Sequence, residues 1–211
     1  MNRCDEFVIL DDVQYTRRDW RNRNRIKTPQ GLKWLTIPVE TRGKYDQLIR
    51  ETRITDPAWA QNHWRQIQQC YGQASYFETY RDQFEDCYRR AGELEFLSDV
   101  NVLFINAIRE LIGIRAEVTC STDYQSDSSK SDKIFDICVQ AKATNYLSGP
   151  AAKDYLVTSD FTTAGIDVEW MDYSGYPEYE QRFEGFEHAV SILDLLFNTG
   201  PDAAKYWRSG Q

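Results

Sequence analysis

Two adjacent carboxylates near the N-terminus are the first residues whose types and spacing could do chemistry. Asp11 and Asp12 follow the apolar run 7–10, which is typical of a strand covered on both faces. Open α/β sheets bind ligands at the carboxyl ends of their strands, so this position favours a site. The pair could act as general base and hydrogen-bond acceptor, or could hold a divalent cation such as Mg²⁺. The alternative is that Asp12 caps a turn while Asp11 faces solvent.

A cationic segment follows this acidic pair. Residues 17–27 contain five arginines and one lysine but a single aspartate. Arginine's planar guanidinium binds phosphate or carboxylate through paired hydrogen bonds, and asparagines at alternating positions would lie on one face of an extended segment. The alternative is a solvated, charged strand or hairpin. The residues expected here to bind a small anionic substrate are Gln14, Tyr15, Asn22, Asn24 and Arg25.

Four residues in the second half of the chain could contact the same kind of ligand. Ser148 and Gly149 lie at an expected strand-to-helix junction, where the free amides of the helix could bind phosphate. No dinucleotide motif, phosphate loop or nucleophile elbow accompanies them, so a structural turn competes with this interpretation. Lys130 and Lys133 flank the start of a helix after a serine-rich loop, which suits closure over a phosphate. A solvated helix start explains them equally well.

The histidine count limits the chemistry further. His63 and His188 are the two histidines, which excludes metal sites built on several imidazoles, and the sequence identifies no particular metal or cofactor. His188 stands at the expected start of an apolar helix and could act as a general acid or base. A purely structural histidine is the alternative. His63 is expected on a helix surface.

Length and composition favour a single domain over residues 1–211, because 41% hydrophobic residues can form one substantial core. The net charge of −8 disfavours nucleic acids and membrane surfaces, which are polyanions. No apolar stretch approaches the roughly 20 residues that span a bilayer, and no signal peptide is evident, so a cytoplasmic location is expected. Five scattered cysteines indicate reduced thiols. The sequence leaves the oligomeric state open.

Strands and helices are expected to alternate along the chain. Helices are expected from Asp56 to Gly72, from a capping box at Ser75 to Gly92, and over residues 98–111, 131–141 and 188–197. Strands are expected at 7–10, 34–39, 114–120, 145–148 and 167–172. This alternation predicts an α/β fold with a mostly parallel, Rossmann-like sheet and helices on both faces.

Four separated blocks resemble the signature blocks of the WbqC-like protein family: residues 7–15, 22–27, 146–149 and 191–198. Several blocks in the right order are more specific than any one of them. The resemblance implies a bacterial cytoplasmic protein associated with gene clusters for O-antigen and other surface polysaccharides. Typical members begin with a strand and a loop resembling His-Gln-Pro-x-Tyr-x-Pro-Trp, and this chain begins after that point. We expect a start codon assigned too far downstream, with a shortened copy as the alternative.

The leading hypothesis is an enzyme that performs group transfer on a nucleotide-linked or carrier-linked sugar in polysaccharide biosynthesis. By fold analogy alone, it resembles nucleotidylyltransferases, in which cationic residues stabilise phosphates. The competing hypothesis is a non-catalytic scaffold that binds pathway enzymes through exposed tyrosines and tryptophans. An RNA-binding module is disfavoured by the net charge.

Overall fold

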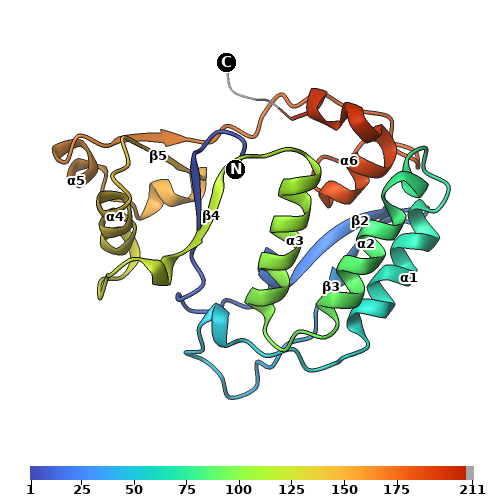
Figure 1. Cartoon of the computed structure of the whole chain (residues 1–211), viewed down its shortest axis with the longest axis horizontal. Helices are drawn as coiled ribbons and strands as arrows, with labels where there is room; N and C mark the ends of the chain where they lie inside the picture. Colours follow the sequence, from blue (N-terminus) through green and yellow to red (C-terminus); the bar gives the residue numbers. More distant parts are fainter. Residues whose placement is uncertain (208–211) are drawn as a thin grey trace. The chain divides into compact units, whose positions relative to one another are not determined.

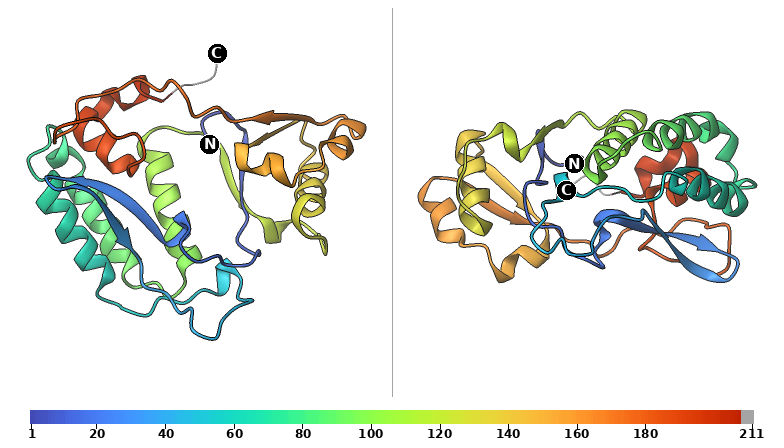
Figure 2. Two further views of the ribbon diagram at one scale, coloured as in Figure 1. Left: turned by 180° about the vertical axis from the view of Figure 1, so that it is seen from behind. Right: turned by 90° about the horizontal axis from the view of Figure 1, so that it is seen from below.

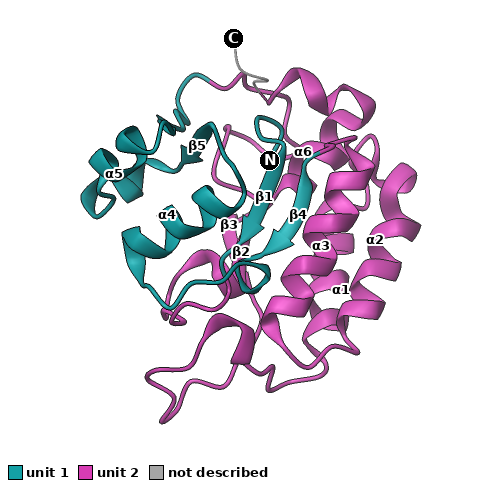
Figure 3. Cartoon of the chain, turned by 60° about the vertical axis from the view of Figure 1, so that its left-hand side comes forward, with its two compact units in different colours: residues 1–10, 116–175 teal, residues 11–115, 176–211 magenta. Residues whose placement is uncertain are grey.

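A computed structural model describes residues 1–207 and shows a mixed α/β chain in two compact units, which Figure 3 colours separately. Unit 1 comprises residues 1–10 and 116–175, and unit 2 comprises residues 11–115 and 176–211. The α/β class is confirmed. The expectation of one domain over residues 1–211 stays a prediction, because compact units can still unfold together as one domain.

Unit 1 contains two pairs of parallel strands. Strand β1 (Glu6–Ile9) pairs with β4 (Glu117–Cys120), and β5 (Asn145–Ser148) pairs with β6 (Asp167–Trp170). Helices α4 (Lys130–Gln140) and α5 (Thr158–Thr163) contribute to a small core around the fully buried Phe161. Short 3₁₀ helices span Ser121–Asp123 and Pro150–Asp154.

Unit 2 combines one antiparallel hairpin with four helices. The hairpin consists of β2 (Arg23–Thr28) and β3 (Gly31–Thr36), and the helices are α1 (Trp59–Tyr71), α2 (Phe77–Ala91), α3 (Leu97–Leu111) and α6 (Ile192–Thr199). Short 3₁₀ helices span Trp20–Asn22, Ile49–Glu51 and Gly200–Lys205. Figures 1 and 2 show α1, α2 and α3 side by side, with the hairpin against one side of this helical layer.

The Rossmann-like sheet is not confirmed. Within residues 1–207 the strands form three separate two-stranded sheets, of which β2–β3 is antiparallel. Strand β2, which carries three of the six cations of this run, is therefore part of a hairpin, and a hairpin was the alternative considered from the sequence. The parallel pairs follow the expected strand, crossover, strand order, but they stay small.

Aromatic side chains hold the helices of unit 2 together. The stripe on α2 is buried, as its helical spacing predicts, and Phe77 and Phe84 contact Phe197 of α6 with ring centroids 5.0 and 5.6 Å apart. Tyr71 at the end of α1 lies 5.5 Å from the same ring. Phe197 is fully buried, so three helices share one apolar contact point.

Several helix starts differ from the sequence expectation. Asp56 accepts a hydrogen bond from the Ala58 amide in a turn, and α1 begins only at Trp59. Ser75 forms no capping box, because Tyr76 precedes α2 without a side-chain cap. The last helix begins at Ile192, where the Ser191 hydroxyl caps Leu193, and not at residue 188.

Gly200 ends α6 in a conformation that other residues rarely adopt. Its φ is +57°, and a Cβ atom there would overlap the ring of Tyr76. Tyr76 is held in place because its amide donates to the carbonyl of Phe197 at 2.9 Å. The glycine therefore permits both the helix end and the close ring contact.

We expect Gly200→Ala to lower the free energy of unfolding by about 2–4 kcal/mol, the sum of a positive-φ penalty and a steric overlap. Gly113→Ala is the matched control, since Gly113 has φ +71° but open space around its Cβ position, and about 1 kcal/mol is expected. Urea unfolding of both variants measures the difference. If both variants lose the same free energy of unfolding, the close contact between Gly200 and Tyr76 does not affect stability.

Candidate functional site

A cavity of about 200 Å³ lies between the hairpin and the helices of unit 2. Most of its lining residues are apolar and the others include arginines and asparagines, a composition typical of small-molecule sites. The apolar residues include Ile26, Leu35, Ile37, Trp59, Tyr88, Val100, Phe104, Ile108, Ile192 and Leu193. The polar residues are Arg21, Asn22, Arg23, Asn24, His63, Asn101 and Ser191.

The structure brings Asn22 and Asn24 to this one cavity. Asn22 ends the 3₁₀ helix before β2, and its buried amide donates to the carbonyl of Ile37 at 2.9 Å. Asn24 lies on β2, is exposed, and its Oδ1 accepts from the Arg25 amide at 2.8 Å. Asn22 is therefore bound within the fold, whereas the amide nitrogen of Asn24 has no hydrogen-bond partner among residues 1–207.

His63 lines the inner part of the cavity and is buried, so its expected place on a helix surface is wrong. Burial lowers the pKa of its imidazole, although a bond between Nε2 and the Thr36 carbonyl at 3.1 Å opposes that shift. The ring also meets Trp59 edge to face, with centroids 5.2 Å apart. This part of the cavity is consequently an uncharged aromatic surface at neutral pH.

The acidic pair does not line the cavity. Asp11 is buried and accepts a hydrogen bond from the Ser98 hydroxyl of α3, while its carbonyl accepts from the Arg50 amide at 2.9 Å. Asp12 is half-buried. Asp11 does not face solvent, and its carboxylate links the start of unit 2 to α3.

Gln14 and Tyr15 hold the loop that precedes the 3₁₀ helix at Ile49–Glu51. The Gln14 amide donates to the Tyr45 carbonyl at 2.7 Å, and the Tyr15 amide donates to the Gln47 carbonyl at 2.9 Å. Burial raises the pKa of the Tyr15 phenol. Their observed contacts are structural.

Arg25 and His188 belong to neighbouring segments of unit 2. The Ser191 amide donates to the Arg25 carbonyl at 2.8 Å, so the chain from His188 to Ser191 reaches the open edge of β2. His188 is exposed in a loop before α6, and its ring meets Phe186 edge to face at 4.6 Å. The expected helix start at this residue is wrong, because capping by Ser191 begins the helix later.

The four other expected residues lie in unit 1. Ser148 ends β5 and is buried, and Gly149 precedes a five-residue 3₁₀ helix where an α-helix was expected. Lys130 is exposed with φ +53° at the start of α4, whereas Lys133 is buried one turn later. A solvated helix start therefore describes Lys130 but not Lys133.

A buried lysine forms a second polar cluster that the sequence patterns did not reveal. Lys27 on β2 is only 3% exposed, and its ammonium donates to Gln181 Oε1 at 3.0 Å, to the Phe183 carbonyl at 2.6 Å and to the Gly185 carbonyl. Gln181 Oε1 also accepts from the Glu187 amide at 2.9 Å. Three acceptors satisfy the three donors of the ammonium. The loop that contains Gln181, Phe183 and Gly185 is therefore held against β2.

A buried aspartate completes this polar core. Asp194 on α6 is fully buried and accepts from the phenols of Tyr71 at 2.8 Å and Tyr179 at 2.9 Å. The Tyr71 oxygen also accepts from the Lys27 amide at 3.0 Å. Burial raises the pKa values of Asp194 and both phenols. The apolar residues on both sides of Asp194 in α6 could have signalled that Asp194 is buried, but not which residues it binds.

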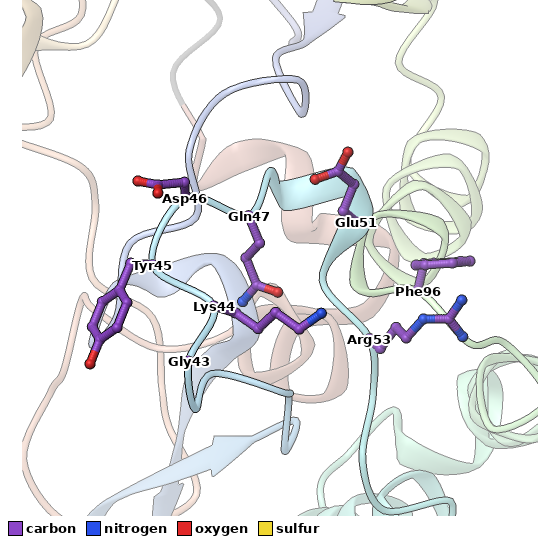
Figure 4. A pocket seen from close by; sticks show the side chains of 8 residues that line it. All are labelled: Gly43, Lys44, Tyr45, Asp46, Gln47, Glu51, Arg53 and Phe96. Carbon is purple, nitrogen blue, oxygen red and sulfur yellow. The ribbon is translucent and has the colours of Figure 1, made fainter.

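A larger hollow of about 640 Å³ lies at the loop around residues 43–47. Figure 4 shows the side chains of Tyr45 and Asp46 pointing away from Lys44 and Arg53, so its polar groups do not converge. Arg53 is already paired with Glu95 and lies 4.8 Å from the Phe96 ring. This hollow is a weaker candidate for a ligand-binding site than the cavity beside β2.

Residues 1–207 contain no group of three or more His, Cys, Asp or Glu side chains placed to hold a metal ion. In the same range, no helix has the length and apolar character needed to cross a membrane. All five cysteines are free thiols, of which Cys87 and Cys138 are buried.

Comparison with known proteins decides the family. The profile of the WbqC-like protein family matches residues 1–206, which is nearly the whole chain. The chain belongs to the WbqC-like protein family. It is 46% identical over 204 residues to "Uncharacterized protein Rv1507c" of Mycobacterium tuberculosis (strain ATCC 25618 / H37Rv), covering 97% of this chain and 88% of that protein. No solved structure matches this family member significantly.

We expect Lys27→Met to lower the free energy of unfolding of this family member by about 3 kcal/mol, because buried acceptors would lose a charged donor. Lys33→Met is the matched control on the neighbouring strand, where the side chain is exposed, and a change within about 0.5 kcal/mol is expected. Urea unfolding followed by circular dichroism measures both. Similar stabilities would contradict a structural role for Lys27.

The buried carboxyl group of Asp194 should make the free energy of unfolding depend on pH in a defined direction. Burial raises the pKa of Asp194, so this carboxyl group binds its proton more tightly in the folded state than in the unfolded state. Its contribution to the stability of the folded state is therefore most favourable below the unfolded pKa of about 4. The stability of the native chain should therefore fall relative to Asp194→Asn as the pH rises above about 4. Urea unfolding of both proteins across this range tests the slope. A difference that rises with pH would mean that the buried carboxylate is favoured.

Proposed function

We propose that this WbqC-like protein is an enzyme of bacterial surface-polysaccharide (O-antigen) biosynthesis that transfers a group on a nucleotide-linked or carrier-linked sugar. The observation that supports this most strongly is the cavity beside β2. Arg21 and Arg23 line it together with Asn22 and Asn24, although the chain as a whole carries a net charge of −8. Local positive charge is what an anionic substrate needs in an acidic protein.

The residues divide into binding and chemical candidates. Asn24, with a free amide nitrogen at the cavity, is the binding candidate that the contacts favour. Asp12, which is half-buried, and His188, which is exposed, remain candidates for proton transfer. Asp11 acts as a positioning residue in this proposal, because Ser98 binds its buried carboxylate. A Mg²⁺ ion would accompany substrate phosphates, which could supply part of its oxygen ligands.

The second candidate function is a non-catalytic scaffold. Trp59 is only 2% exposed and Trp207 is half-buried, so Trp20, Trp59 and Trp207 do not form an exposed patch. Trp20 is exposed and instead packs against Trp34. That pair is the observation that favours a scaffold. A scaffold would bind a purified pathway enzyme, lose that binding in Trp20→Ala, and bind no nucleotide-sugar.

Titration calorimetry with UDP-glucose, with and without Mg²⁺, tests the enzyme proposal. We expect binding that weakens about tenfold in Asn24→Ala, because one hydrogen bond to a charged or sugar oxygen is worth about 1.5 kcal/mol. Asn62→Ala on the exposed face of α1 is the matched control and should bind like the native chain. Absence of binding to UDP-glucose, to other nucleotide-sugars and to a prenyl diphosphate sugar under both conditions would contradict the proposal.

A further inference from the structure

Two arginines and two tryptophans form one connected surface on the hairpin of unit 2. We call Trp20, Arg23, Arg25 and Trp34 the Trp–Arg platform. Arg25 and Trp34 are direct cross-strand partners, and side chains two residues apart on a strand share a face, so Arg23 joins them. Trp20 comes from the 3₁₀ helix before β2.

The four side chains pack against one another. The Arg23 guanidinium lies 4.2 Å from the centroid of the Trp34 ring, and that of Arg25 lies 5.3 Å from the same ring and 5.0 Å from Trp20. The two indole centroids are 4.8 Å apart, with a tilt of 57° between their planes. Both guanidinium groups therefore face one indole ring at cation–π distance.

The indoles nevertheless stay in contact with water. Trp20 is 51% exposed and Trp34 is 39% exposed. Large aromatic side chains are usually buried, and an adjacent exposed pair is typical of a binding surface. A ring laid on these indoles would remove apolar area from water and stack on an aromatic face.

Among the residues that the structure describes, the two arginines of the platform form no ion pair, although the Asp19 carboxylate attracts Arg23 at longer range. Arg23 donates to the carbonyls of Asp19 at 3.1 Å and of Arg18. Within residues 1–207, no carboxylate lies at ion-pair distance from Arg23 or Arg25, and Nε of Arg25 is buried without a hydrogen-bond partner. The carboxylate of Asp19 pairs with Arg21. Two like charges beside one ring repel each other, and a bound dianion would relieve this repulsion.

Stacking also determines which donors remain available. A guanidinium that lies over an indole keeps its N–H bonds in its own plane, where they can reach an oxyanion in pairs. We propose that the Trp–Arg platform binds a diphosphate through Arg23 and Arg25 and stacks the attached sugar or base on Trp20 and Trp34. This inference rests on the proposed function, because nucleotide-linked and carrier-linked sugars both contain a diphosphate.

Binding of inorganic pyrophosphate tests the ionic half of the platform without requiring activity. Tryptophan fluorescence and calorimetry should detect pyrophosphate binding to the native chain, and Arg25→Gln should weaken it at least tenfold. Arg25→Lys, which keeps the charge but loses the planar fork, should also weaken it several-fold. Arg65→Gln is the matched control, since Arg65 is exposed on α1 and carries the same charge. Equal effects of Arg25→Gln and Arg65→Gln would overturn the platform.

Ring stacking is tested with UDP-glucose, UDP and a short-chain prenyl diphosphate sugar. We expect each ligand whose ring stacks to bind about tenfold or more tightly than pyrophosphate, and Trp20→Leu to remove this advantage while leaving pyrophosphate binding nearly unchanged. The ligand with the largest advantage identifies the source of the diphosphate. Neutral glucose should not bind detectably. Unchanged UDP-glucose binding in both Trp20→Leu and Trp34→Leu would overturn the stacking assignment.

Failure of the platform and failure of the proposed function give different results. If UDP-glucose binds but Arg25→Gln and Trp20→Leu leave its affinity unchanged, the platform is wrong and the function stands. If pyrophosphate binding depends on Arg25 but no nucleotide-linked or carrier-linked sugar is transformed, the function is wrong and the platform stands. Circular dichroism and melting temperature of each variant establish that it is folded before its affinity is compared.

Discussion

Burial of the Lys27 ammonium is the constraint on which much of unit 2 depends. An ammonium removed from water costs several kcal/mol unless hydrogen bonds replace its hydration shell. Lys27 obtains these bonds from Gln181 and from the carbonyls of Phe183 and Gly185. The loop around residues 181–187 must therefore follow one course along β2, although it contains neither helix nor strand.

Tyr71 extends this constraint to two helices. Its phenolic oxygen accepts from the Lys27 amide and its hydroxyl donates to Asp194, so one side chain of α1 joins β2 to α6. The ring of Tyr71 meanwhile packs on Phe197 of the aromatic core. A polar network that is fully bonded and enclosed by aromatic rings specifies one arrangement of its elements, because any displacement would leave a buried group unpaired.

Local patterns predicted the helices and strands better than they predicted the site. The stripe of Phe77, Phe84 and their neighbours identifies α2 because it repeats every turn, and that repeat needs no distant residue. The partners Lys27 and Gln181 are 154 positions apart, and Tyr71 and Asp194 are 123 apart. No periodicity encodes such pairs, so the sequence showed Lys27 only as the last member of the cationic segment 17–27.

Asn22, Asn24 and two arginines line one cavity, but for a different reason than the one that suggested their proximity. An extended segment was expected to align the two asparagines, but Asn22 lies in a 3₁₀ helix and is bound to Ile37. The cavity contains both residues because the chain turns into β2 between them. Asp11 could not be placed from sequence, since its partner Ser98 comes 87 positions later.

The alternation of β2 explains how one short strand can serve two surfaces. Arg23, Arg25 and Lys27 point to one face of the hairpin, and Asn24 and Ile26 point to the other. The first face carries the Trp–Arg platform and the second contributes to the cavity against the helices. Trp20 and Arg23 of the platform also line that cavity, so the two surfaces adjoin.

The backbone of β2 is held on both of its edges. On one edge β3 pairs with the strand, and on the other the Ser191 amide bonds to the Arg25 carbonyl and the Lys27 amide bonds to Tyr71. The arginines of the platform therefore project from a rigid strand and not from a free loop, and less conformational entropy is lost when they bind an anion. The buried lysine on β2 thus helps to fix the positions of the two half-buried arginines that precede it on the same strand.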